Sequence, residues 1–149
     1  MQKFIIIFFF LIFGSSHVFS NEIDYFVSLK KDKVNVRYGP GLDYPIKYIY
    51  KKKFLPVKVI DKKENFRRII DHKKNSGWIH HIMLQKSKSL ITTSQKILFK
   101  KPTKYSEPLA KIEKGRLLIF KKCVKDWCNI KSGQYSGWIS KSNLWGISK

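Results

Sequence analysis

Apolar and polar residues alternate with a period of two along much of the chain after residue 30. Four pairs of apolar residues stand two positions apart: Val34 and Val36, Val57 and Val59, Ile97 and Phe99, and Leu117 and Ile119. Glycine and proline interrupt the pattern about every ten residues, and no long stretch has the 3.6-residue period of an amphipathic helix. The pattern therefore predicts an all-β protein of short strands, with Val34 and Val36 facing a core.

An internal repeat divides the chain into two similar copies. NSGWIHHIML at residues 75–84 recurs as YSGWISKSNLW at residues 135–145, with the Ser-Gly-Trp-Ile cores 60 residues apart. Two further pairs of segments correspond in the same way: 44–60 with 107–123, and 65–69 with 126–130. A repeat of this length that contains several short strands indicates two copies of one small β unit. The polar segment 85–89 lies between the copies, and we expect it to be a flexible boundary.

The first 20 residues have the organisation of a secretory signal peptide. Lys3 precedes an unbroken apolar run from Phe4 to Phe13, and small polar residues follow it. Val18 and Ser20 fit the minus-three and minus-one positions of a signal-peptidase site, with cleavage before Asn21. The run is short for a membrane span, and an uncleaved N-terminal anchor is the alternative. We therefore expect an exported, periplasmic protein.

The charge balance is strongly basic, with 31 lysines and arginines against 10 acidic residues and a formal net charge of +21. Only Lys3 among these charges lies in the predicted signal peptide, so the mature chain keeps nearly all of them. Such a surface associates electrostatically with anionic surfaces such as cell-wall carboxylates or acidic lipids. Only four of the basic residues are arginines, which specific nucleic-acid readers favour. We expect no specific nucleic-acid recognition.

Two cysteines lie five residues apart in KCVKDWCNIK. If Lys125 and Asp126 form a two-residue hairpin turn, Cys123 and Cys128 face one another in the second pair from the turn, with Cα atoms ~4.5 Å apart. That separation is within the range that a disulfide bridges. A metal-binding thiol pair is the alternative, but no nearby histidine supplies further ligands. In an exported protein the pattern favours a structural disulfide.

Five segments, in this order, resemble the bacterial SH3-like domain in its tandem exported form. They are VSLKKDKVNVRYGPGLDYPI, LPVKVI, NFRRI, SGWIHHIML and, in the second copy, CVKDWCNIKSGQYSGWISKSNLWGI. The resemblance covers nearly all of residues 25–147. It implies two five-stranded, partly open β-barrels, one at residues 21–86 and one at residues 90–149, after the signal peptide at residues 1–20. Modules of that family bind cell-wall peptidoglycan or proteins.

The two copies depart from the family pattern in different ways. The first copy has Phe66 where a tryptophan is typical, and Tyr38 where a small residue usually precedes Gly-Pro-Gly. The second copy keeps the strand and the prolines of the opening motif at residues 96–108, but it has neither the Asn-x-Arg sequence nor the glycines. We therefore expect any ligand function of the opening motif to reside in the first copy.

The sequence offers no convincing catalytic or metal site. Two barrels leave no residues for a separate hydrolase domain, and cysteines in a disulfide cannot act as nucleophiles. His80 and His81 are adjacent, and neighbouring residues of a strand point to opposite faces, so they cannot easily share a metal ion. His72 stands apart, acidic residues are scattered, and Gly-Pro-Gly lacks the Lys-Ser/Thr of a phosphate-binding loop. We expect a non-catalytic protein without metal or cofactor.

The stretch KVNVRYGPGLDYP at residues 33–45 carries the candidate ligand site. Its glycines permit positive φ and its proline sets a turn, which brings tyrosines near Arg37. Aromatic faces beside an arginine can hold a sugar ring or a peptide stem and pair its carboxylate. The alternative is structural, with Asn35 and Arg37 bonding to carbonyls of the turn. The candidate ligand-binding residues are Asn35, Arg37, Tyr38, Gly39, Gly41, Tyr44 and Tyr48.

Aromatic residues are plentiful for so short a chain. We expect four of them to fill the cores, because a small barrel has few other ways to bury enough apolar surface: Phe66, Trp78, Trp127 and Trp138. A binding role is the alternative for the tryptophans. The sequence thus predicts a non-catalytic, exported binding protein that attaches to peptidoglycan. The alternative function is a protein-interaction or scaffolding module for another envelope protein.

Overall fold

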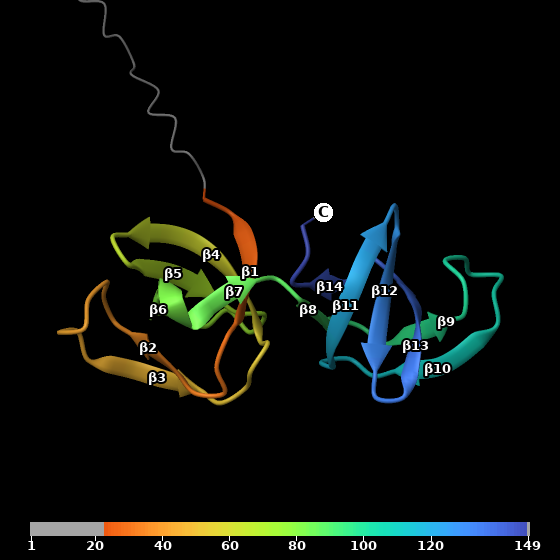
Figure 1. Cartoon of the computed structure of the whole chain (residues 1–149), viewed down its shortest axis with the longest axis horizontal. Helices are drawn as coiled ribbons and strands as arrows, with labels where there is room; N and C mark the ends of the chain where they lie inside the picture. Colours follow the sequence, from red (N-terminus) through yellow and green to blue (C-terminus); the bar gives the residue numbers. More distant parts are fainter. Residues whose placement is uncertain (1–22, 149) are drawn as a thin grey trace, which may run out of the picture.

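The computed structural model describes residues 23–148, which form two antiparallel sheets side by side (Figure 1). The predicted signal peptide lies outside the described residues. The first sheet contains β1 (Tyr25–Leu29), β2 (Val34–Arg37), β3 (Ile46–Tyr50), β4 (Pro56–Lys63), β5 (Phe66–Ile70), β6 (Ser76–His80) and β7 (Leu84–Lys86). The second sheet contains β8 (Ser89–Thr92), β9 (Lys96–Phe99), β10 (Pro108–Ile112), β11 (Leu117–Val124), β12 (Trp127–Ser132), β13 (Tyr135–Ser140) and β14 (Leu144–Trp145). We call these the first unit and the second unit.

The two units have the same topology. The strand order is β3-β2-β6-β5-β4-β1-β7 in the first unit and β10-β9-β13-β12-β11-β8-β14 in the second. Each strand of the first unit therefore corresponds to the strand of the second unit whose number is seven higher. The predicted all-β tandem is confirmed. Each unit has seven strands rather than five, because short segments such as β7 and β14 also pair at a sheet edge.

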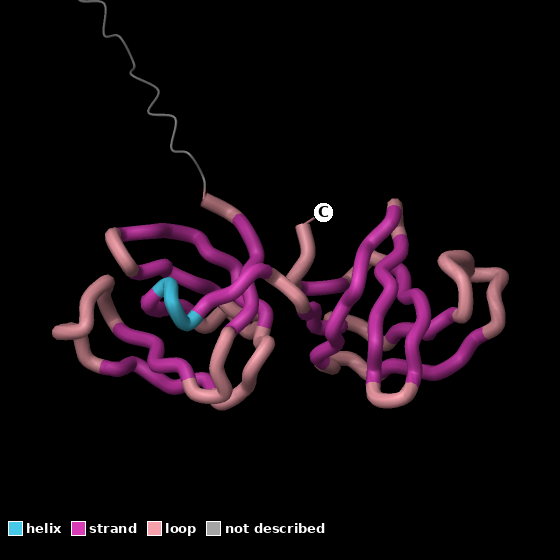
Figure 2. The backbone as a smooth tube through the Cα atoms, in the orientation of Figure 1, coloured by secondary structure: helices cyan, strands magenta, loops and turns pink. Residues whose placement is uncertain are grey.

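Helical structure in residues 23–148 is limited to the 3-10 turn η1 (His81–Met83), which links β6 to β7 (Figure 2). No helix in that part of the chain has the length and apolar character needed to cross a membrane.

Each sheet packs one face around a core. Val34 and Val36 of β2 are buried, as the alternation predicted. In β9, however, Leu98 is buried and Ile97 is 38% exposed. The sequence Ile-Leu-Phe at residues 97–99 is apolar throughout, so the pattern alone allows either register, and a shift by one residue exchanges the faces. The structure places Leu98 inward, with its Cγ atom 3.0 Å from where a Cβ atom on Gly137 would lie.

The Gly-Trp-Ile motif joins the β2–β3 and β9–β10 hairpins to the rest of their sheets. A Cβ atom on Gly77 would overlap Val36 Cγ1 and lie 3.0 Å from the carbonyl oxygen of Arg37, and one on Gly137 would lie 2.6 Å from the carbonyl oxygen of Phe99. Only a residue without a side chain permits this approach. The motif's isoleucines, Ile79 and Ile139, are fully buried in the two cores.

The tryptophans do not fill the cores, so that expectation was wrong. Because Gly77 and Ile79 of β6 point inward, Trp78 between them must point to the opposite face, which we call the outer face. Trp127 and Trp138 are also only half-buried, and all three tryptophans lie outside both core clusters. Phe66 is buried, but it packs edge-on against His80, which is its cross-strand partner, and not within a core cluster.

The segment between the units is held firmly, so the expected flexible boundary was wrong. Ser28 and Ser89 are fully buried, and their hydroxyl oxygens lie 2.8 Å apart. The Ser89 hydroxyl donates to the carbonyl of Phe54, and the backbone N–H of Lys88 donates to the Ser28 hydroxyl at 3.2 Å. The polar residues of the segment therefore supply the partners that buried polar groups require.

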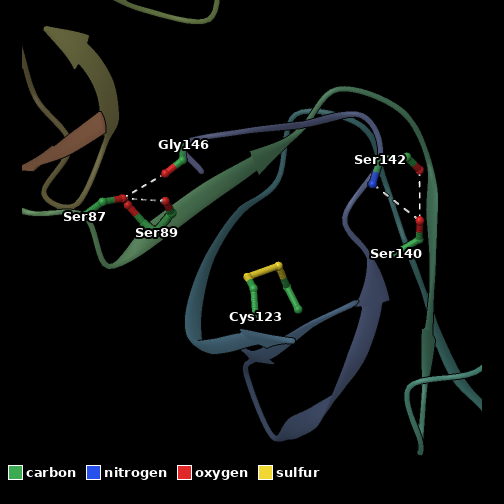
Figure 3. The surroundings of a disulfide bond; sticks show 7 residues. Ser87, Ser89, Cys123, Ser140, Ser142 and Gly146 are labelled. Carbon is green, nitrogen blue, oxygen red and sulfur yellow. Dashed lines mark hydrogen bonds between the residues drawn. A yellow bond between two sulfur atoms is a disulfide. The ribbon is translucent and has the colours of Figure 1, made fainter. Parts of the chain in front are cut away.

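Strand β14 of the second unit also contacts the first unit. The Trp145 indole N–H donates to the carbonyl oxygen of Pro56 at 3.1 Å, and its ring meets Phe26 edge-on at 5.1 Å. Nearby, the Ser87 hydroxyl donates to the carbonyl oxygen of Gly146 at 2.9 Å (Figure 3). Ile91 of β8 belongs to the first unit's core cluster. The two units therefore share apolar and polar contacts.

The predicted disulfide joins Cys123 to Cys128 across the β11–β12 hairpin (Figure 3). The Cα atoms are 4.0 Å apart, and the two residues are direct cross-strand partners, as the two-residue turn required. In the first unit, Lys62 and Arg67 face each other at the equivalent hairpin position. The disulfide thus replaces a facing pair of cations.

Replacing Trp145 by alanine should weaken the junction. The variant loses an edge-on aromatic contact and an indole hydrogen bond, and we expect the free energy of unfolding to fall by about 2–3 kcal/mol. The single urea transition expected for the wild type should separate into two, measured by circular dichroism. Tyr105→Ala, at a position that is 86% exposed, is the control and should unfold like the wild type. An unchanged single transition for Trp145→Ala would contradict the coupling.

Reducing the disulfide should destabilise the second unit by about 2 kcal/mol, the entropic contribution expected for so short a closed loop. Urea unfolding with and without reductant measures the difference. The double variant Cys123→Ala/Cys128→Val is the control and should not respond to reductant. Native protein whose thiols react with an alkylating reagent before reduction would show that the disulfide does not form.

Candidate functional site

Two adjoining hollows lie on the outer face of the first unit and share Arg37. The apolar hollow has a volume of about 420 Å³. Its apolar walls are Leu42, Ile46, Ile49, Phe66 and Met83, and its polar rim is Lys33, Asn35, Arg37 and His80. The cationic hollow has a volume of about 320 Å³. It is lined by Arg37, Tyr38, Lys47, Arg68, Ser76, Gly77 and Trp78.

Strand alternation explains the apolar hollow. Asn35 and Arg37 alternate with core residues on β2, so both point outward, and Asn35 faces Ile49 on β3. Leu42, Ile46 and Ile49 are all exposed in spite of their apolar side chains. Several exposed apolar side chains beside a few polar groups are typical of a ligand-binding surface.

Arg37 has a structural contact and remains available to a ligand. Its Nη1 donates to the carbonyl oxygen of Tyr44 at 2.7 Å, which fixes the β2–β3 turn together with the bond from Tyr38 N–H to the Pro45 carbonyl oxygen at 3.2 Å. A guanidinium group has five N–H donors, so one bond leaves others free to face the hollows. Arg37 can therefore fix the turn through one N–H group and still offer its other N–H groups to a ligand in the hollows.

The glycines of the turn act through their missing side chains. Glycine permits positive φ, but neither Gly39 nor Gly41 adopts it. Instead, a Cβ atom on Gly39 would overlap the Tyr44 ring, and one on Gly41 would overlap the Asp43 carboxylate. The glycines therefore make room for Tyr44 to fold over the turn, where it lines neither hollow.

Tyr48 lies on the opposite side of the hairpin from the hollows. It packs with Tyr50 against the first core, and its hydroxyl donates to the Tyr50 hydroxyl at 3.3 Å. Tyr50 in turn donates to Asp71 Oδ2 at 2.9 Å. The structure thus brings Asn35, Arg37 and Tyr38 to the hollows, and it places Tyr44 and Tyr48 elsewhere.

Asp71 is a buried acceptor that organises the β5–β6 loop. Besides Tyr50, it accepts hydrogen bonds from the backbone N–H groups of Lys73 and Asn75 and from the Asn75 amide, all between 2.9 and 3.0 Å. Burial alone would raise the pKa of Asp71, but these hydrogen bonds to the carboxylate outweigh it and lower the pKa below the ordinary value.

A row of directly opposed residues crosses the cationic hollow. Arg68 on β5 and Arg37 on β2 are both cross-strand partners of Trp78 on β6, so the three side chains lie on the outer face. Lys47 donates to the carbonyl oxygen of Ser76 at 2.9 Å and lies 5.6 Å from the centre of the Tyr38 ring. Sequence reasoning missed Arg68 and Lys47, because only the pairing of the strands shows which residues lie beside Trp78.

His80 and His81 do not point to opposite faces as we expected. Their rings stack with centres 5.0 Å apart, because His81 leaves the strand and begins η1. Within residues 23–148, no three His, Cys, Asp or Glu side chains gather as a metal site would require.

The second unit has a different outer face. Phe99 takes the position of Arg37, Asn129 that of Arg68 and Trp127 that of Phe66. The Phe99 and Trp127 rings meet edge-on at 5.8 Å. In the second unit, two aromatic rings that contact each other therefore occupy the positions of Arg37 and Phe66, which line the apolar hollow in the first unit.

A comparison with protein families agrees with the tandem architecture. A model of the bacterial SH3 domain matches residues 30–86 and again residues 94–146. Among solved structures, NlpC2 and NlpC1 from Trichomonas vaginalis are similar over 87% and 84% of this chain, each at 13% identity, with TM-scores of 0.39 and 0.38. The chain spans 50% and 46% of the lengths of those two proteins. No curated protein matches the chain.

The hydrogen bonds of Asp71 predict an acid-sensitive first unit. Because the folded-state pKa is lowered, the stabilisation is complete above the ordinary Asp pKa of about 4 and is lost as pH falls through the folded value. Asp71→Asn should cost about 2–3 kcal/mol near neutral pH and progressively less in acid. Urea unfolding from pH 7 to about pH 2 measures this, with exposed Asp61→Asn as the control. A difference that stays constant over that range would contradict the prediction.

Proposed function

The chain belongs to the bacterial SH3 domain family, and from this premise we propose that it is a non-catalytic, exported tandem binding protein that attaches to cell-wall peptidoglycan. The binding surface is the outer face of the first unit. The observation that carries the proposal is the pair of hollows, one apolar and one cationic, which meet at Arg37.

The chemistry of the two hollows suits a peptidoglycan fragment. Its sugars carry acetyl and lactyl methyl groups, and its peptide stems carry free carboxylates. Leu42, Ile46 and Ile49 offer exposed apolar surface to methyl groups and aliphatic side chains. Asn35 and Lys33 supply polar contacts at the rim. A ligand of mixed character fills both hollows better than a purely ionic polymer would.

The excess positive charge supports retention at an anionic wall. The formal charge is +21 for the whole chain, and the ion pairs of residues 23–148 are Lys58 with Asp24 and Lys100 with Glu107. Most cations therefore face solvent without an acidic partner. Their attraction to wall carboxylates is long-range at low salt and is screened over about 8 Å at physiological ionic strength. Specific retention at that salt depends on the hollows. The predicted signal peptide supports a periplasmic location.

A second candidate function is attachment to another envelope protein. It is favoured by β3, which stands at the edge of the first sheet and exposes Ile46 and Ile49. An extended segment of a partner could pair with this edge and place side chains in the apolar hollow. A photo-crosslinking residue at position 49 should then trap one discrete protein in cells. Crosslinks to peptidoglycan fragments instead would favour the first proposal.

Co-sedimentation of the protein with purified sacculi at physiological salt tests the proposal. Ile49→Ser should weaken retention about tenfold, because it removes apolar contact worth about 1.5 kcal/mol. The matched control is Ile97→Ser, since Ile97 lies on the outer face of the second unit and is 38% exposed against 37% for Ile49. Ile97→Ser should bind like the wild type. Retention no better than that of a charge-matched unrelated protein, or equal loss in both variants, would sink the proposal.

A further inference from the structure

The cationic hollow concentrates an uncommon residue of this chain. Only four of the 31 basic residues are arginines, yet Arg37 and Arg68 both face Trp78 as direct cross-strand partners. Their Cα atoms lie two strand spacings apart, about 10 Å, so two long side chains can converge above the indole between them. Lysine would provide charge at these positions, but only arginine provides a planar pair of donors that matches a carboxylate.

Two of the three cations of the hollow, Arg37 and Lys47, are held by backbone carbonyl oxygens, and none of the three forms an ion pair with a described carboxylate. The Tyr44 carbonyl oxygen orients the Arg37 guanidinium, and the Ser76 carbonyl oxygen orients Lys47. Asp61 lies opposite Arg68 on β4, but its Oδ1 accepts a bond from the Lys62 backbone N–H, and both ion pairs of residues 23–148 lie elsewhere. The hollow therefore holds positive charge that forms no ion pair with a described carboxylate.

The second unit provides an internal comparison. It keeps the tryptophan, as Trp138, but has Phe99 and Asn129 where the first unit has its two arginines. The fold therefore forms without arginines at these two positions. Their presence in the first unit requires an explanation other than the architecture of the sheet.

We propose that the hollow between Arg37 and Arg68, above Trp78, binds a carboxylate group of the ligand. Each arginine offers N–H donors from one side, Lys47 adds positive charge, and the faces of Trp78 and Tyr38 contact the aliphatic atoms next to the carboxylate. The identity of the ligand as a peptidoglycan stem peptide rests on the proposed function, whereas the carboxylate site does not. The free carboxylate at the end of the stem occupies the cationic hollow, while the rest of the fragment extends into the apolar hollow.

Two muropeptides of the same sugar and stem, one with free and one with amidated carboxyl groups, test the proposal in NMR titrations of the protein. The free form should bind about tenfold more tightly than the amidated form and shift the backbone amides of Arg37, Arg68 and Trp78. Arg68→Asn should weaken binding of the free form about tenfold and leave the amidated form unaffected. This variant copies Asn129, which the second unit accommodates at the same position. Arg116→Asn, an equal loss of charge in the second unit, is the matched control and should bind like the wild type.

The outcomes separate the two proposals. Equal binding of both muropeptides, or no effect of Arg68→Asn, overturns the carboxylate site and leaves the proposed function standing. If neither muropeptide binds, the proposed function fails. The carboxylate site is then tested by titrating N-acetyl-alanyl-alanine and, separately, its C-terminal amide. The carboxylate site is supported if the free acid, but not the amide, shifts the backbone amide of Trp78 and if this shift is absent in Arg68→Asn. If the free acid causes no shift, the carboxylate site is overturned. Inorganic phosphate that shifts the same amides as strongly would overturn the preference for a carboxylate.

Discussion

The close approach of two backbones at Gly77, repeated at Gly137, is the constraint on which both units depend. Val36 and the Arg37 carbonyl oxygen crowd the place of a side chain on Gly77, and the Phe99 carbonyl oxygen does so at Gly137. Each hairpin therefore joins its sheet at a residue without a side chain. Strand alternation then fixes the rest of the motif, with isoleucine in the core and tryptophan on the outer face. A short sequence signal therefore determines both how the sheet is assembled and which large aromatic ring faces solvent.

Predictions from local geometry succeeded, and predictions that needed distant partners did not. The disulfide followed from a two-residue turn, and the tandem followed from the repeat, because both depend on residues that are close in sequence or equal in spacing. The tryptophans were placed wrongly because size and aromaticity suggested burial, whereas the inward positions of β6 belong to Gly77 and Ile79. The hollows could not be predicted because Arg37, Ile49 and Arg68 come from three strands whose side-by-side arrangement is settled only by the sheet topology. The role of Gly39 could not be predicted for a similar reason, since its decisive neighbour is the folded-back Tyr44 ring.

The two units show how one architecture supports different surfaces. At the positions of Arg37 and Phe66, the second unit has Phe99 and Trp127, whose rings contact each other. At the positions of Lys62 and Arg67, it has the disulfide. Both changes remove positive charge from the sheet and replace it with contacts inside the chain. The second unit therefore gains internal contacts where the first unit exposes polar and charged groups, which is the distribution expected if one unit binds and the other supports it.

The contacts between the two units bear on this difference between their surfaces. Fully buried serines meet between the units, Trp145 bonds to Pro56, and Ile91 of the second unit completes the first core. Separating the units would expose these apolar groups and leave buried hydroxyl groups without partners, and each such loss costs free energy. A flexible linker would let each unit search for its own ligand, but a fixed junction makes the second unit part of the first unit's scaffold. The proposed binding surface, although carried by one sheet, is thereby stabilised by contacts from both.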